Sequence, residues 1–314
     1  MKILLTGGNG FVGKYLQTKL YDHTLVLTSR GNVLGNSPKY FKKTISSKES
    51  FEDCLMDVEV VIHAAARVHQ MNDLAEDPHK EFMETNCFGT LNLARQAARA
   101  GVKRFIFLSS IKVNGEESHS GNPYRFDDPR MPKDPYGISK AKAEEGLLKI
   151  AAETRLEVTI IRPPLVYGPD VKANFAALLK LASKNVPLPL GSVNNKRSFV
   201  ALDNLVNLIV TCIDHPEAAN QVFLVSDDND VSTSELFSIM VDAFGKKARL
   251  INVSPRFLWL IAKLIGKEEV IDRLCGDLSV DIRHTKNTLD WTPVVSLVDA
   301  VKICASKSLT NKQY

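Results

Sequence analysis

Near its start the chain reads Ile3-Leu-Leu-Thr-Gly7-Gly-Asn-Gly10-Phe-Val-Gly13, a short apolar run followed by spaced glycines. Gly7 can take a tight turn, Gly10 lets the backbone approach a pyrophosphate, and Gly13 allows a helix to pack closely on a strand. The N-terminus of a helix that begins here would face the phosphates. A purely structural turn is the alternative, but the position directly after a predicted first strand favours dinucleotide binding.

Outward from this turn, short apolar runs alternate with segments of helical periodicity. The predicted strands are at 3–5, 25–28, 58–62, 105–108 and 158–161, and the predicted helices are at 11–20, 51–55, 82–100 and 136–153. Strands that are separated by helices form a parallel sheet. We therefore predict an α/β fold, in which residues 1–168 form a Rossmann doubly wound parallel sheet that binds a dinucleotide.

The pattern changes after residue 168, where helical segments predominate. We expect helices at 173–184, 203–214, 232–244 and 256–274, and one strand at 222–225. Residues 169–314 are therefore predicted to form a smaller, mostly helical substrate lobe. The strand at 222–225 could return to the main sheet, so the two domains are not cleanly separable in the sequence.

The composition is that of an ordinary globular protein. Of 314 residues 44% are hydrophobic and 24% are charged, and 40 basic against 36 acidic residues give a net charge of +4. This balance argues against nucleic-acid binding. Five scattered cysteines without metal-ligand spacing indicate free thiols in a reducing cytoplasm and no metal site. The apolar run at 257–265 is too short to span a membrane and predicts a buried helix, with a membrane-surface role as the less favoured alternative.

Tyr136 and Lys140 are four residues apart in a predicted helix, so their side chains share one face. A tyrosine normally loses its proton at about pH 10, and a nearby ammonium favours the phenolate, so the pair predicts a base. Ser110 closely follows the predicted strand 105–108, and ligands of open parallel sheets bind beyond the carboxyl ends of the strands. We expect the Ser110 hydroxyl to meet Tyr136 there and to hydrogen-bond a substrate alcohol or ketone.

The predicted second strand ends in Thr28-Ser-Arg30-Gly31. An acid near this point commonly holds the adenosine ribose of NAD, and none is present in these residues. Arg30 could instead contact the 2′-phosphate of NADP. A solvated surface arginine is the alternative, so the choice between NAD and NADP stays open.

Together these segments resemble the extended short-chain dehydrogenase/reductase family, in its NAD-dependent epimerase/dehydratase branch. The resemblance covers most of the chain. It is greatest to a UDP-glucose 4-epimerase-like subgroup that includes UDP-N-acetylglucosamine 4-epimerases and UDP-N-acetyl-quinovosamine dehydrogenases. It rests on the segments 6–13, 63–66, 86–90, 109–110, 136–140 and 162–169.

The resemblance implies a role for each matched residue. Tyr136 would take the proton of the sugar C4 hydroxyl, Ser110 would orient the C4 oxygen, and Lys140 would lower the tyrosine pKa and hold the nicotinamide ribose. The implied contacts of the cofactor are Gly7, Gly10, Phe11, Val12, Gly13, Arg30, Ile45, Ala64, Ala65, Ala66, Asn86, Tyr136, Lys140 and Pro163.

The resemblance also implies a UDP-sugar substrate and a homodimer. The implied substrate contacts are Ser110, Asn174, Arg197, Arg273 and Asp277. For Arg273 and Asp277 a surface pair on a helix is an equal alternative. The family often dimerises through two long helices, which are expected here at 87–100 and 136–152.

Several positions depart from the family pattern. The 4,6-dehydratases of this family carry Asp-Glu after the catalytic hydroxyl, but this chain has Ile111 and Lys112, which argues against a dehydratase. Thr44, before Ile45, replaces the acid expected after the third strand. The family favours a UDP-sugar 4-epimerase. The missing acids favour an NADP(H)-dependent 4-ketoreductase or dehydrogenase of a UDP-4-keto-6-deoxy-N-acetylhexosamine, and a non-catalytic dinucleotide sensor is the minor alternative.

Overall fold

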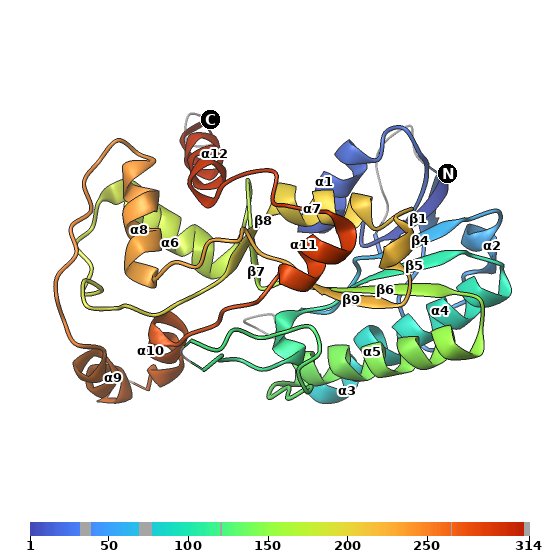
Figure 1. The fold of residues 1–314 in the computed structure, drawn as a ribbon, viewed down its shortest axis with the longest axis horizontal. Helices are drawn as coiled ribbons and strands as arrows, with labels where there is room; N and C mark the ends of the chain where they lie inside the picture. The colour runs from blue at the N-terminus through green and yellow to red at the C-terminus, as the bar shows by residue number, and fades with distance from the viewer. Residues whose placement is uncertain (32–38, 69–76, 120, 265, 311–314) are drawn as a thin grey trace.

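The computed structural model describes residues 1–31, 39–68, 77–119, 121–264 and 266–310. A seven-stranded sheet lies at its centre in the order β3-β2-β1-β4-β5-β6-β9, and every neighbouring pair is parallel (Figure 1). Its strands are β1 (Lys2–Thr6), β2 (Thr24–Ser29), β3 (Lys39–Lys42), β4 (Val60–His63), β5 (Arg104–Leu108), β6 (Glu157–Arg162) and β9 (Gln221–Leu224). The predicted Rossmann doubly wound sheet is confirmed.

Helices cover both faces of the sheet. Alternate residues of a strand point to opposite faces, so Ile3 and Leu5 enter one apolar cluster while Leu4 enters the other. The helices of the first layer are α1 (Phe11–Lys19), α7 (Leu202–Thr211) and α11 (Arg283–Leu289), and those of the second are α2 (Glu52–Leu55), α4 (Thr90–Arg99) and α5 (Pro135–Glu153). Figure 1 shows these layers above and below the strands. Burial on both faces explains why the strands read as continuous apolar runs.

The boundary between the two domains is crossed by several elements. Strand β9 pairs with β6, so the run near 222–225 does return to the main sheet. Helix α7 packs on α1 and helix α11 on β9, although both come from beyond residue 168. The division into a dinucleotide-binding domain, 1–168, and a substrate lobe, 169–314, stays a proposal.

The remaining elements form the lobe beside the sheet (Figure 1). They are β7 (Leu165–Tyr167), α6 (Ala173–Lys184), β8 (Phe199–Ala201), α8 (Thr233–Asp242), α9 (Pro255–Leu264), α10 (Glu268–Cys275) and α12 (Leu297–Thr310). Helices α6, α8 and α12 enclose a core of their own, which includes Tyr167, Phe237 and Val301. In the described ranges no helix is long and apolar enough to cross a membrane.

Two of the predicted helices are interrupted. The segment 82–100 consists of the end of α3 (Pro78–Phe82), a π-helical segment, Met83–Gly89, and α4. Gly89 permits this path, because a Cβ there would lie 2.7 Å from the Ser46 backbone nitrogen. The segment 256–274 is divided into α9 and α10, because Gly266 has a left-handed φ of 63° just beyond the end of the first helix. Residue 265 lies outside the described residues.

Candidate active site

The glycine turn between β1 and α1 is shaped by close backbone packing. Gly7 has a φ of 72°, and a Cβ on it would lie 2.7 Å from the Ala65 nitrogen. A Cβ on Gly13 would lie 2.2 Å from the Gly7 carbonyl oxygen, so only glycine fits there. Gly10 donates to that same oxygen at 2.8 Å and caps α1, having no side chain of its own. The first N–H groups of α1 can therefore meet a pyrophosphate, and the turn fits a dinucleotide.

A buried polar chain connects this turn to the loop after β4. Thr6 Oγ1 lies 2.7 Å from His63 Nδ1 and accepts from the Ala65 backbone nitrogen at 3.2 Å. The other ring nitrogen of His63 lies 2.9 Å from the Thr90 hydroxyl oxygen. Burial lowers the pKa of His63 to about 3, so its ring is neutral. The ends of β1 and β4 and the start of α4 are thus held together without an ionised group.

Asn86 lies in the π-helical segment and connects the same loop to α5. Its amide oxygen accepts from the Arg67 backbone nitrogen at 2.8 Å, and its amide nitrogen donates to the Arg67 carbonyl at 3.0 Å. That nitrogen also lies 3.1 Å from the Ser139 hydroxyl oxygen. These contacts show Asn86 positioning the backbone beside the predicted cofactor contacts. π-Helical segments are frequent at functional sites for this reason.

Helix α5 begins where Asp134 and Pro135 provide a strong start signal. The Asp134 carboxylate accepts from the Gly137 nitrogen at 2.7 Å, and Pro135 occupies the first helical position. Tyr136 follows at once, and the Ser110 hydroxyl is close enough to its phenol to lower the phenol pKa. The Lys140 ammonium lies on the same face and donates to the Leu108 carbonyl at 2.8 Å. The predicted group of Ser110, Tyr136 and Lys140 is therefore brought together at the end of β5.

The electrostatics of this group are set mainly by burial. Burial raises the pKa of Tyr136 to about 12, and the Asp134 carboxylate adds to the rise, while the Ser110 hydrogen bond opposes it. Burial also lowers the pKa of Lys140 to about 7, although Glu144 opposes this. Lys140 is thus only about half charged near neutral pH. In the protein alone burial and Asp134 therefore decide the Tyr136 pKa, and the predicted lowering by Lys140 stays a prediction.

A buried ion pair fixes α5 against the sheet. The Arg162 guanidinium, at the end of β6, donates to both carboxylate oxygens of Glu144, at 3.0 Å to Oε1 and 2.6 Å to Oε2. The Ser109 hydroxyl donates to the same carboxylate at 2.6 Å. Both charged side chains are almost fully buried. Removal of one partner from such a pair costs roughly 3–5 kcal/mol, so the pair holds Tyr136 and Lys140 in register with β5.

The other predicted cofactor residues lie on several elements. Phe11 and Val12 begin α1, Ala64, Ala65 and Ala66 follow β4, the strand next to β1, and Pro163 follows β6, two strands farther along the sheet. The Pro163 carbonyl accepts from the Ile111 nitrogen at 3.0 Å and so connects the end of β6 to the Ser110 turn. Arg30 is exposed beyond the end of β2. Ile45 is buried in the core beneath Gly89.

The predicted substrate residues are only partly brought together. Arg197 Nη1 donates to the Gly276 carbonyl at 2.9 Å; burial lowers the pKa of this guanidinium, and the nearby carboxylates of Glu117 and Asp277 oppose that shift. Asp277 accepts from the Lys196 nitrogen at 2.6 Å. The half-buried Arg197 is thus next to Asp277.

The two other predicted substrate residues lie elsewhere on the lobe. Arg273 is exposed on α10 and bonds Glu269 one turn earlier, so it is a surface pair and does not join Arg197. Asn174 is exposed in the first turn of α6. Asp170 and Ala173 precede it with φ values of 64° and 58°, a strained backbone of the kind found at ligand sites.

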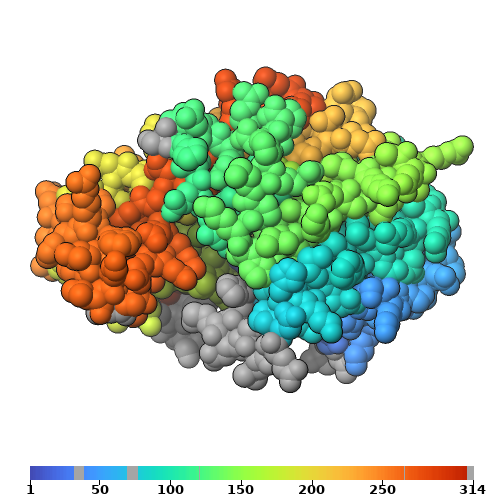
Figure 2. All heavy atoms as spheres, turned by 90° about the horizontal axis from the view of Figure 1, so that it is seen from below, coloured from blue at the N-terminus to red at the C-terminus, as the bar shows by residue number. Residues whose placement is uncertain are grey.

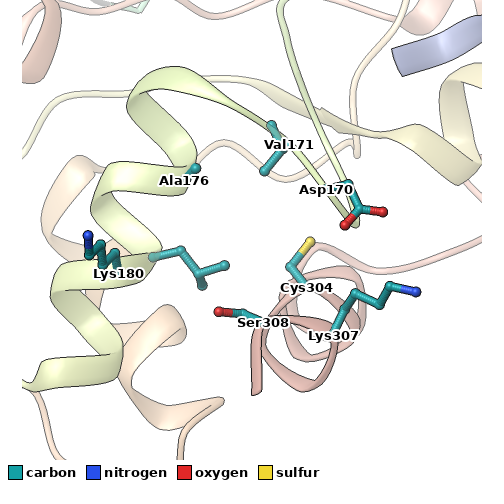
Figure 3. A pocket seen from close by; sticks show the side chains of 9 residues that line it. Asp170, Val171, Ala176, Lys180, Cys304, Lys307 and Ser308 are labelled. Atoms are coloured by element: carbon teal, nitrogen blue, oxygen red, sulfur yellow. The ribbon is translucent and has the colours of Figure 1, made fainter. Parts of the chain in front are cut away.

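A separate cavity of about 320 Å³ lies in the lobe between α6 and α12. Figure 3 shows Ala176 and Lys180 on one side and Cys304, Lys307 and Ser308 on the other. Its lining includes none of the predicted site residues. It is therefore distinct from the group around Tyr136.

Known proteins match this chain over most of its length. The sequence profile described as the NAD dependent epimerase/dehydratase family matches residues 3–226. A UDP-glucose 4-epimerase of Vibrio cholerae is 48% identical over 312 residues, which cover 98% of this chain and 95% of that protein.

The chain belongs to the NAD dependent epimerase/dehydratase family. Among solved structures, UDP-glucose 4-epimerase of Thermotoga maritima with UDP-glucose gives a TM-score of 0.78 at 24% identity, covering 99% of this chain and 100% of that one. UDP-glucuronic acid 4-epimerase of Bacillus cereus in complex with NAD gives 0.78 at 21% identity, covering 99% of both chains. These structures share the fold with this family member. The predicted family and the nicotinamide cofactor class are confirmed.

Several residues that shape the site were not predicted for it. Asp134 starts α5 and forms an ion pair with Lys112, next to Ser110 in the chain. Glu144 anchors α5, and His63 connects β4 to Thr90 at the start of α4. The Asp-Pro step before Tyr136 was a readable signal of a helix start. The other contacts join residues far apart in the sequence, which no local pattern reveals.

Proposed function

We propose that this chain is an NAD-dependent UDP-sugar 4-epimerase. The observation that carries the proposal is the meeting of Ser110, Tyr136 and Lys140 at the carboxyl end of β5, in a chain 48% identical to a UDP-glucose 4-epimerase of Vibrio cholerae. Ligands of open parallel sheets bind at this edge. The glycine turn that fits a pyrophosphate lies at the same edge, at the end of β1, which β4 separates from β5.

In this proposal each of the three side chains has a separate role. When the sugar C4 hydroxyl is oxidised to a ketone, its proton moves to the Tyr136 oxygen, and it returns when the ketone is reduced. The Ser110 hydroxyl orients the C4 oxygen. Lys140 supplies a positive charge and a hydrogen-bond donor beside the phenol.

The cofactor would be held by residues that the structure gathers around the first βα turn. Gly7, Gly10 and Gly13 would receive the pyrophosphate, and Asn86 would fix the loop after β4. Bound NAD supplies the acceptor and donor of the C4 hydride and, when oxidised, a positive charge that would favour the Tyr136 phenolate. This charge matters because the pKa of Tyr136 in the protein alone is raised to about 12.

The UDP group would be held by the lobe. Arg197 is half-buried and lies next to Asp277, and a guanidinium binds two oxygens of a diphosphate at once. Asn174 lies on a strained segment of the same lobe. Arg273 is not part of this proposal, because its side chain pairs with Glu269 on the surface of α10.

Turnover of purified protein with UDP-glucose and with UDP-N-acetylglucosamine tests the proposal. We expect the C4 epimer of at least one sugar to form, as measured by NMR of the anomeric protons. Tyr136→Phe should lower the rate about a thousandfold, because general acid–base catalysis contributes roughly 10²–10⁴-fold. Formation of a 4-keto sugar without its epimer, or full activity of Tyr136→Phe, would contradict the assignment.

A second candidate is an NADP(H)-dependent 4-ketoreductase of a UDP-4-keto-6-deoxy-N-acetylhexosamine. The observation that favours it is the exposed Arg30 beyond the end of β2, where Ser29, Arg30 and Gly31 include no acid. A guanidinium there would suit a 2′-phosphate. Arg30→Asp should then shift binding from NADP toward NAD, as measured by titration of both. An unchanged preference would make Arg30 a surface residue and leave the epimerase as the better proposal.

The predicted homodimer also stays a proposal. Phe88 is 49% exposed in the π-helical segment that leads into α4, and α4 packs beside α5. An exposed aromatic next to two long parallel surface helices suits a contact between copies. Light scattering of the intact protein would give twice the mass of one chain, and Phe88→Asp should reduce it to one.

A further inference from the structure

Helix α9 has an apolar side that faces away from the protein. Its residues Phe257, Leu260, Ile261 and Leu264 are 55, 52, 43 and 81% exposed. Their spacing of three, four and seven places them on one stripe of the helix. We call this set the α9 stripe. A soluble protein normally turns such a stripe inward, so its outward position requires a ligand or a surface.

The inner side of α9 is already buried against the lobe. Leu258 and Ala262 are 8 and 4% exposed, and Leu258 packs in a small apolar cluster with Leu190 and Val193. The helix therefore does not need to rotate to bury its core face, and the α9 stripe is a second, outward apolar side.

Positive charge surrounds the α9 stripe. Arg256, Lys263 and Lys267 are exposed on or beside the helix, and the chain has no acidic residue from 243 to 267. The Lys263 ammonium lies 5.1 Å from the Trp259 ring centre, over an indole that is 39% exposed. Glu268 and Glu269 begin α10, so the basic stretch ends there. Apolar residues, tryptophan and cations together are typical of helices that lie in the interface of a bilayer.

We propose that the α9 stripe docks this enzyme on an anionic lipid bilayer. Charge decides between a bilayer and a second copy of the chain. A two-fold contact through the stripe would bring Arg256, Lys263 and Lys267 of both copies together, and like charges repel. Anionic headgroups neutralise the same three cations. Helix α9 is too short to span the hydrocarbon, with 10 residues, so it would lie along the surface.

The position of α9 suits this docking. It lies at the end of the lobe farthest from the sheet in Figure 1, and Figure 2 shows the same segment as an orange surface at one end of the molecule. Behind the helix a cavity of about 340 Å³ is lined by Arg256, Trp259 and Gly276. The Gly276 carbonyl accepts from Arg197. If the proposed function holds, docking brings the diphosphate-binding side of the lobe next to the membrane.

Vesicle co-sedimentation of the full chain tests the docking. The probes are vesicles of equal parts phosphatidylglycerol and phosphatidylcholine, and vesicles of phosphatidylcholine alone. The unmodified protein should sediment with the first and not with the second, and added salt should release it. Leu260→Ser with Leu264→Ser should weaken binding about tenfold or more, and Lys263→Gln with Lys267→Gln should do the same.

A matched control removes exposed apolar groups elsewhere. Tyr21 and Met56 are 78 and 66% exposed in the sheet domain, and Tyr21→Ser with Met56→Ser should bind vesicles like the unmodified protein. Trp259 gives a second readout. Its emission should shift to shorter wavelength with anionic vesicles, and Trp259→Phe should lose this shift because the buried Trp291 does not contact lipid.

Three results would overturn the docking. They are failure of the unmodified protein to bind anionic vesicles, binding by the leucine variant that equals the unmodified protein, or self-association that the leucine variant abolishes while no vesicle binds. The last result would assign the α9 stripe to a second copy. Turnover of a dissolved UDP-sugar should be unchanged in the leucine variant, so a failure of docking is distinguishable from a failure of the proposed function.

Discussion

Lys112 and Asp134 illustrate how residues beside the reacting group set its chemistry. Lys112 follows Ser110 by two positions and forms an ion pair with Asp134, the residue that caps α5. The Asp134 carboxylate raises the pKa of the neighbouring Tyr136 phenol, after burial the second cause of that rise. Lys112 therefore partly neutralises the Asp134 carboxylate. Without Lys112, the pKa of Tyr136 should be higher still. A cation here is also incompatible with the dehydratase pattern.

Lys112→Met should move the acidic limb of the kcat/KM profile to higher pH. In the proposed mechanism the Tyr136 phenolate is the active base, and an uncompensated Asp134 should raise the phenol pKa further, because the carboxylate disfavours a second negative charge beside it. The profile should be measured over the full pH range in which the protein is folded. Lys112→Arg keeps the charge and should restore the original profile, so equal profiles for all three proteins would contradict this role.

The first βα turn and the π-helical segment are the elements that place the cofactor contacts. Each depends on a glycine that allows two backbones to approach. Gly13 lies against Gly7, and Gly89 lies against the chain at Ser46. Gly10 differs, because a Cβ there would meet just the Gly7 carbonyl oxygen, at 3.1 Å. The first βα turn therefore contains two glycines for packing, Gly7 and Gly13, and one, Gly10, that leaves space for a ligand.

Gly13→Ala and Gly10→Ala should separate these two roles. Gly13→Ala forces a clash with the Gly7 carbonyl and should cost roughly 3 kcal/mol or more of unfolding free energy. Gly10→Ala should cost less than about 1 kcal/mol but weaken NAD binding about tenfold or more. Denaturant unfolding and NAD titration of both variants measure this. Equal stability of the two variants would contradict the packing role of Gly13.

The buried His63, at the end of β4, predicts that the protein loses stability in acid. Its pKa is lowered by burial to about 3, whereas in the unfolded chain it stays near the ordinary value of 6.5. The unfolded state therefore binds the proton first as the pH falls, and stability falls with it from about pH 6.5 downward. From pH 6.5 to pH 5 this group should cost about 2 kcal/mol.

The matched variant for this effect is His63→Asn. It should be less stable at neutral pH, because the bonds to Thr6 and Thr90 change, but it should lose about 2 kcal/mol less between pH 6.5 and pH 5. Urea unfolding at several pH values measures the difference. Parallel losses in both proteins would show that His63 is not the titrating group.

At the scale of the whole molecule, the proposed function assigns NAD to the sheet domain and the UDP group to the lobe. The predicted cofactor contacts lie around β1, β4 and α5, and Arg197 lies in the lobe beside Asp277. Helix α7 and strand β9 return from the lobe sequence to the sheet, so the two parts share an apolar cluster. Because the proposed NAD contacts and the proposed UDP contact Arg197 lie on different elements, loss of UDP binding should leave NAD binding intact.

Arg197→Ala should weaken UDP binding about ten- to hundredfold, because a charge-assisted bond to a diphosphate is lost. NAD binding should be unchanged, because Arg197 contacts no predicted cofactor residue among those described. Isothermal titration of UDP and of NAD measures both affinities. Equal losses of the two would contradict the placement of UDP in the lobe.

The sequence was sufficient where structure is local. Continuous apolar runs identified the central strands, and the spacing of Tyr136 and Lys140 identified their shared helix face. The sequence did not predict strand β3, at Lys39–Lys42, because it is short and half exposed. It did not predict β7 and β8, because they have three residues each. The pKa of Tyr136 could not be predicted, because burial depends on contacts across the fold. The bond between Thr6 and His63 joins residues 57 apart and has no local signal.

The most direct test of the account follows deuterium on the sugar. UDP-glucose or UDP-N-acetylglucosamine with deuterium at C4 should give an epimer that keeps deuterium on C4, without consumption of added NADPH, because the same carbon loses and regains it within one site. Tyr136→Phe should form the epimer about a thousandfold more slowly while still binding NAD. An accumulating 4-keto sugar, or an epimer whose C4 carries hydrogen from solvent or from added NADPH, would contradict the central claim.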